Sequence, residues 1–85
     1  MMEPEIGDRI QVAGVIHTIN EAGRCMFTML GELDGVITLV RPSGFVEFTS
    51  THFGNCRVHI SAITAITKRF ELGPTWEEGS DVNFL

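Results

Sequence analysis

Residues 35–70 read GVITLVRPSGFVEFTSTHFGNCRVHISAITAITKRF, and this stretch decides the fold. Most of the chain's β-branched residues lie here, in short alternating runs separated by turns that contain glycine. Residues 36–41 and 45–50 alternate on either side of a Pro-Ser-Gly turn at residues 42–44. Proline presets φ for such a turn and glycine accepts positive φ, so the sequence predicts a β-hairpin.

The second half of the stretch predicts two further short strands. The expected elements are a polar loop at 51–55, a strand at 56–60, one helical turn at 61–63 capped by Ser61, and a closing strand at 64–70. A helix over residues 61–71 is the alternative. The many β-branched residues between 63 and 67 are weak helix formers and favour the strand.

Two strands are expected before this stretch. Residues 9–20 alternate as a strand, in which Gly14 indicates a bulge or sharp coiling. After a turn at 20–23, residues 24–30 return antiparallel, and residues 31–35 connect them to the hairpin.

Size and composition indicate one folded domain. The chain has 85 residues, of which 44 % are hydrophobic and 20 % charged. A chain of this length buries only about 60–65 % of its unfolded surface, so self-association would add useful burial. The expected organisation is an acidic segment at 1–8, a β-domain at 9–70 and an acidic, aromatic tail at 71–85.

The net charge of −5 belongs to the ends of the chain. Residues 9–69 hold all six basic residues and four of the eleven acidic ones, and are therefore weakly basic. This distribution disfavours both a nucleic-acid mimic and a strong nucleic-acid binder. Apolar runs are too short for a membrane span, and the acidic start is unlike a secretory signal, so we expect a cytoplasmic protein.

The run VHISAITAITKR, residues 58–69, resembles the last-strand segment of Sm-type proteins, in particular the bacterial RNA chaperone Hfq. The resemblance implies a small barrel whose last strands build a ring interface. The chain departs from the family in two respects: too few residues precede Arg9 for the opening helix, and the RNA-contacting Lys-His pair falls at Ile60 and Ser61. The resemblance therefore supports the architecture more than RNA binding.

These observations together predict an all-β protein. We expect a small SH3/Sm-like barrel or a strongly coiled antiparallel sheet of five to six short strands, with an acidic C-terminal tail.

The cysteines and histidines give little support for a disulfide framework, a metal site or a catalytic nucleophile. Cys25 and Cys56 are too few for a secreted disulfide framework. Zinc is conceivable from the C-x-x-H spacing of Cys56 and His59 together with His17 and Cys25, but positions 56 and 59 point to opposite sides of a strand. A Cys–His nucleophile lacks an evident orienting group. We expect no enzyme, no cofactor and no metal.

Anion binding has more support. Arg24, Arg41 and Arg57 lie near strand ends beside glycine-bearing turns, and His52 and Phe53 lie in a loop. Guanidiniums can hold an anionic ligand in bidentate fashion and an aromatic ring can stack on its base. The alternative is that these arginines are ordinary solvated charges. None of the known glycine-rich phosphate loops is present.

Exposed apolar residues would serve association. The tail carries Trp76, Phe84 and Leu85, and the body has more large apolar residues than a small barrel hides.

The predicted function is a non-enzymatic, self-associating module that occludes a protein or sequesters a small anionic ligand. Size and character would suit an inhibitor or regulator from a phage or mobile element. An Sm-like protein that binds single-stranded RNA is the alternative.

Overall fold

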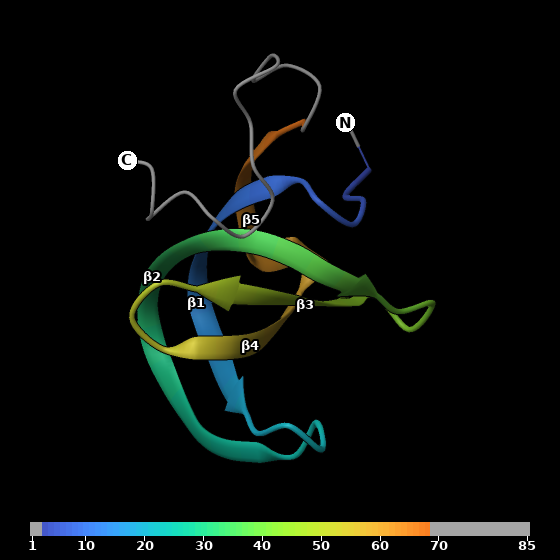
Figure 1. Cartoon of the computed structure of the whole chain (residues 1–85). Helices are drawn as coiled ribbons and strands as arrows, with labels where there is room; N and C mark the ends of the chain where they lie inside the picture. The colour runs from blue at the N-terminus through green and yellow to red at the C-terminus, as the bar shows by residue number, and fades with distance from the viewer. Residues whose placement is uncertain (1–2, 69–85) are drawn as a thin grey trace.

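The computed structural model describes residues 3–68, which form five β-strands and one 3₁₀ turn in a single antiparallel sheet (Figure 1). The elements are β1 (Arg9–Ile19), β2 (Cys25–Val40), β3 (Phe45–Ser50), β4 (Gly54–His59), the 3₁₀ turn η1 (Ile60–Ala62) and β5 (Ile63–Thr67). The all-β prediction is confirmed for this part of the chain. The tail at 71–85 lies outside the described residues.

β1 is the central strand. It pairs with β2 along its whole length, with β5 near its start, and with β4 at His17↔Arg57 and Thr18↔Cys56. β2 pairs in turn with β3, and β3 with β4. The strands therefore coil so far that β4 returns to β1.

β2 is longer than the sequence predicts. Two strands separated by a connection at 31–35 were expected, and that expectation is wrong: Cys25–Val40 is one continuous strand. Glycines bend it without breaking it. Gly31 lies opposite Gly14, whose φ is +124°, and Gly35 packs so closely on the Thr49 carbonyl that it leaves no room for a Cβ.

The hairpin at residues 36–50 is confirmed. β3 has the predicted bounds, and the Arg41 amide donates to the Phe45 carbonyl at 2.9 Å across the turn. Gly44 takes φ of +96° there, the conformation for which glycine was expected.

The end of the described chain differs in detail from the prediction. A strand–turn–strand sequence is confirmed and the alternative helix is wrong for residues 61–68. The cap of η1 is His59 rather than Ser61, because the His59 ring accepts a hydrogen bond from the Ser61 amide at 3.1 Å. The hydroxyl of Ser61 also contacts His59 Nδ1, at 2.8 Å.

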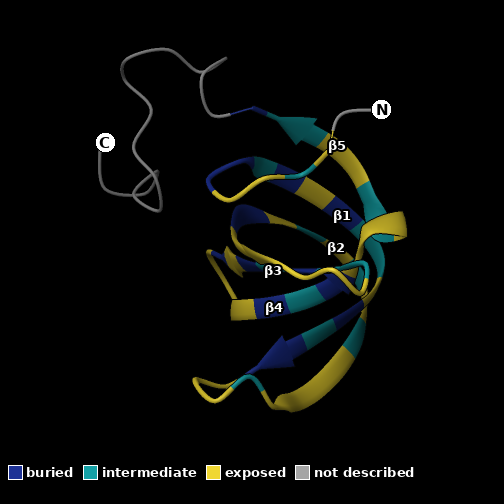
Figure 2. Ribbon diagram, turned by 90° about the vertical axis from the view of Figure 1, so that its right-hand side faces the viewer, coloured by how far each residue is buried: buried dark blue, intermediate teal, exposed yellow. Residues whose placement is uncertain are grey.

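The core is built from buried residues that are spread along the strands of the coiled sheet (Figure 2). Its fully buried side chains come from β1, β2, β3 and β4: Ile10, Val12, Ile16, Ile37, Val46, Phe48, Cys56 and Val58. The residues before β1 join this body. Gly7 donates to the Ile37 carbonyl and Ile37 donates to the Asp8 carbonyl, both at 2.9 Å. No helix among residues 3–68 is long and apolar enough to cross a membrane.

Candidate anion-binding face

Two of the predicted arginines meet at one carboxylate on the outer side of the sheet. Arg41 follows β2, Arg57 lies within β4, and Glu47 lies between them on β3, opposite Arg57. One Glu47 oxygen, Oε2, accepts from Arg41 Nε at 2.9 Å and from Arg57 Nη2 at 3.0 Å. The carboxylate therefore holds both guanidiniums in place.

Arg57 is fixed from a second direction. Its Nη2 also donates to the Gly23 carbonyl at 2.7 Å, and its Nε donates to Glu47 at 3.2 Å. Gly23 belongs to the turn between β1 and β2, so this side chain ties that turn to the β3–β4 pair. A guanidinium held by two fixed acceptors loses little further freedom when it binds a ligand.

The pKa of Glu47 reflects this arrangement. Burial works against the charged form of the carboxyl, but the hydrogen bonds and charges of Arg41 and Arg57 outweigh burial and hold the pKa below its ordinary value. Glu47 is therefore ionised at neutral pH, and the three side chains together carry one net positive charge.

These arginines line an open hollow of about 410 Å³. Its lining residues are His17, Cys25, Arg41, Ser43, Phe45 and Arg57. The ring of Phe45 is held edge-on against the His59 ring, with centroids 5.2 Å apart. The hollow thus combines cationic donors with one apolar ring.

A small polar cluster borders the same hollow. The His17 ring Nδ1 lies 2.9 Å from the Thr28 hydroxyl and 3.9 Å from the Cys25 sulfur, and that sulfur lies 3.6 Å from the hydroxyl. Cys25 is exposed, so it is accessible from solvent. The sequence suggested His17 and Cys25 only as metal ligands or a nucleophile pair. Their place beside the arginines depends on the β1–β2 and β1–β4 pairings, which no local pattern encodes.

The other suggested zinc ligands lie elsewhere. Cys56 is fully buried in the core, where burial raises the pKa of its thiol, and the His59 ring is engaged by Ser61. Within residues 3–68, no group of three or more His, Cys, Asp or Glu side chains could hold a metal ion.

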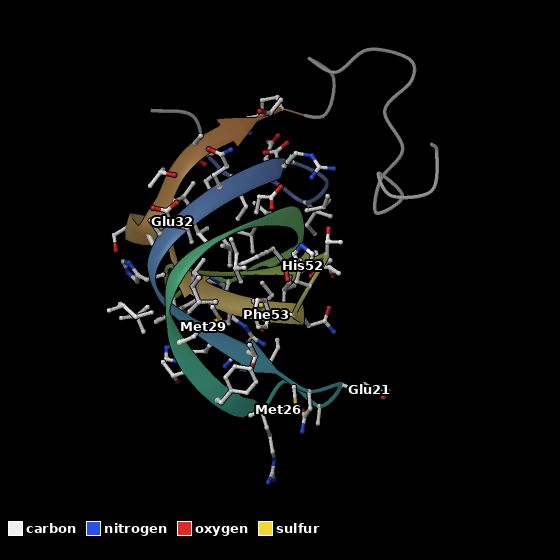
Figure 3. The ribbon with its side chains drawn as sticks, turned by 90° about the vertical axis from the view of Figure 1, so that its left-hand side faces the viewer. Glu21, Met26, Met29, Glu32, His52 and Phe53 are labelled. Carbon is white, nitrogen blue, oxygen red and sulfur yellow. The ribbon has the colours of Figure 1, made fainter. Side chains whose placement is uncertain are left out.

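The remaining predicted ligand residues are not brought into the hollow. Arg24 is exposed in the β1–β2 turn, where its amide bonds to the Asn20 side chain at 3.0 Å. His52 and Phe53 lie in the β3–β4 turn, at the other end of β3 from Phe45, and are labelled there in Figure 3. Trp76, Phe84 and Leu85, predicted as partner or oligomer contacts, lie outside the described residues.

The chain matches no family model, no curated protein and no solved structure.

Proposed function

We propose that this chain is a non-enzymatic, self-associating binding module. It sequesters a small anionic ligand, or occludes a protein partner by holding an acidic group of that partner. We further infer that its coiled sheet is a small SH3/Sm-like barrel and that it acts in the cytoplasm. The observation that supports anion binding best is the pair Arg41 and Arg57, joined by Glu47 on the wall of an open hollow.

The charge balance favours an anion. Glu47 neutralises one of the two guanidiniums, which leaves one positive charge for a ligand. A guanidinium offers five N–H donors, and Glu47 and Gly23 engage only those on Nε and Nη2. The donors on Nη1 of Arg41 and Arg57 remain for a phosphate or carboxylate, in charge-assisted hydrogen bonds.

The remaining lining residues suit a ligand with a planar part. His17 lies opposite Arg57 in the β1–β4 pair and adds a ring nitrogen to the site. Phe45 offers the apolar surface on which a planar group can pack. A volume of about 410 Å³ accommodates a small molecule, such as a nucleotide, or one acidic side chain with its neighbours.

Calorimetric titration with adenosine monophosphate and with inorganic phosphate tests the proposal. Arg41→Gln should weaken binding of either probe about tenfold, the cost of one charge-assisted hydrogen bond. Arg24→Gln is the matched control, since it removes the same charge from a residue outside the hollow, and it should change affinity little. Absence of binding to the wild-type chain, or equal losses in both variants, would contradict an anion site at Arg41.

Single-stranded RNA remains the alternative ligand. An oligonucleotide titration at two salt concentrations distinguishes it, because a phosphate backbone held by several arginines loses affinity steeply with salt. Equal weakening by Arg24→Gln and Arg41→Gln, with a steep salt dependence, would favour RNA over a single bound anion.

A further inference from the structure

The first half of β2 is an open edge of the sheet. β2 pairs with β1 from Cys25 onward, but its pairing with β3 begins only at Gly35. Residues 25–34 therefore have a described strand on one side only. Figure 3 looks onto this part of β2, along which Met26, Met29 and Glu32 are labelled. Such an edge is a template for another strand.

Two residues of β2, Phe27 and Ile37, show which backbone amides and carbonyls face β1 and which face the open edge. Phe27 bonds toward β1, since its amide and carbonyl contact the Thr18 hydroxyl at 3.3 and 3.0 Å. Ile37 also bonds toward that side, to Gly7 and Asp8. The β1–β2 register is regular between these points, so odd residues face β1 and even residues face outward. The outward-facing residues are Thr28, Leu30, Glu32 and Asp34.

Side chains at this edge include the most exposed large apolar residue of residues 3–68. Leu30 is 79 % exposed, and Val15, its partner on β1, is 52 % exposed on the same face. On the other face Phe27 is half exposed, and Leu33 is partly buried. Apolar groups beside backbone groups that no described strand engages are typical of a surface that another strand covers.

The geometry points to this edge as the surface through which two copies of the chain associate, each adding its β2 antiparallel to the other, with the twofold axis at Leu30. The inference rests on the self-association in the proposed function and gives it a surface. Outward backbone groups of Leu30 then meet those of Leu30 in the second copy, and those of Thr28 meet those of Glu32. The twofold axis repeats the second pair as Glu32 with Thr28, so three pairs exchange two hydrogen bonds each, about six in total.

Side chains fit this register. Leu30 lies opposite its own copy, and Val15 flanks it in each chain, so that four exposed apolar side chains form one row. Phe27 lies opposite Leu33 of the second copy on the other face. A strand of this chain therefore supplies the pattern that the edge requires, which is why we assign the edge to a second copy.

The neighbouring registers that also place a hydrogen-bonded pair on the twofold axis fit less well. An axis at Glu32 places two carboxylates directly opposite each other, which destabilises a strand pair. An axis at Thr28 would require Met26 to pair with Leu30 of the second copy. Met26 is the extra residue of β2 where the β1–β2 register shifts, and such a bulge interrupts regular pairing. An axis at Leu30 keeps Glu32 opposite the Thr28 hydroxyl and keeps the ladder within 27–33.

Light scattering of the full chain over a concentration series tests the association. The wild-type chain should reach twice its 9.4 kDa monomer mass. Leu30→Lys places two ammonium groups opposite each other and should yield a monomer at concentrations where the wild type is a dimer. Leu39→Lys is the matched control: it makes the same change on the same strand where β3 already covers the edge, and it should remain a dimer.

A charge pair tests the register. Thr28→Glu faces Glu32 of the second copy and should weaken the dimer at least tenfold, and adding Glu32→Lys should restore it. Failure of the second change to restore the dimer would overturn the register.

The outcomes separate this inference from the proposed function. A wild-type monomer that still binds phosphate would overturn the dimer and leave the anion site standing. A dimer that survives Leu30→Lys would show another surface and overturn this one. A dimer that depends on Leu30 but binds no anion would confirm the β2 edge as the dimer surface and contradict the proposed anion binding.

Discussion

At Glu47 the carboxylate is only 13 % exposed, yet it accepts hydrogen bonds from two guanidiniums. The arginines hold its pKa below the ordinary value despite burial. A carboxylate whose pKa falls on folding stabilises the folded state above its unfolded pKa, and this stabilisation is lost as pH falls through the folded pKa. Glu47 should therefore contribute to stability at neutral pH and lose that contribution in acid.

Glu47→Gln tests this role. The variant leaves the partly buried Arg57 guanidinium and the exposed Arg41 guanidinium with a neutral acceptor, so the free energy of unfolding at pH 7 should fall by about 1–3 kcal/mol. The difference from wild type should shrink as pH falls below the ordinary glutamate pKa of about 4.3, because the carboxyl of the unfolded chain binds protons there before the folded carboxyl does. Urea unfolding at several pH values measures both effects. Glu21→Gln, at an exposed turn position, should change neither.

Among the elements, β2 is the most unusual, because one continuous strand pairs with β1 in its first part and with β3 in its last part. One strand serves two neighbours because its glycines let it coil past β1 and then run beside β3. Gly35 is the position where this path allows no side chain, since a Cβ would collide with the Thr49 carbonyl and the Phe48 ring.

Gly35→Ala should therefore destabilise the fold by about 1–3 kcal/mol, the usual cost of overpacking. Gly31→Ala is the matched control on the same strand, because a Cβ there meets only Met29 Cε at an ordinary 3.5 Å. Its free energy of unfolding should stay within about 0.5 kcal/mol of wild type. Thermal and urea unfolding measure the two variants, and equal effects would contradict the account of Gly35.

A buried ion pair joins Asp8, just before β1, to Lys68, just after β5. The Lys68 Nζ donates to Asp8 Oδ2 at 2.8 Å, and both side chains are buried. The hydrogen bond to Asp8 raises the pKa of Lys68. A raised lysine pKa stabilises the folded state fully below the unfolded pKa, and this is lost as pH rises through the folded pKa.

Lys68→Met should cost about 3 kcal/mol at pH 7, because it removes a cationic partner from the buried carboxylate of Asp8. The difference in the free energy of unfolding between wild type and variant should narrow above the ordinary lysine pKa of about 10.5, because the ammonium of the unfolded chain deprotonates there before that of the folded chain. Arg24→Met, at an exposed turn, serves as the control. A gap that stays constant up to pH 12 would contradict the assigned ion pair.

These elements also show which parts of the fold and of the candidate site can be predicted from the sequence. The hairpin at 36–50 was predictable because its Pro-Ser-Gly turn and alternation are local signals. The continuity of β2 was not, since Gly31 and Gly35 read as loop residues until β1 and β3 are known to lie beside them. The Arg41–Glu47–Arg57 cluster was predictable only in part: the sequence indicates the two arginines, but only the β3–β4 register brings the Glu47 carboxylate between them.

For the whole molecule, the described residues place a fixed cationic site and an open strand edge on one small sheet. Among residues 3–68 the core cluster has eight fully buried side chains, which is modest for an independently folded domain. Pairing of two copies at β2 would bury apolar groups that each copy now exposes. The two proposals are separable, because the proposed anion site rests on Arg41 and the proposed dimer edge rests on Leu30.

Native mass spectrometry of the full chain, isolated from the cells that express it, tests this account most directly, since one spectrum reports subunit number and retained ligand together. The account predicts a dimer at twice 9.4 kDa that carries an added anionic mass on each subunit. The added mass should disappear with Arg41→Gln, and the dimer should disappear with Leu30→Lys. A bare monomer in the wild-type sample would contradict it.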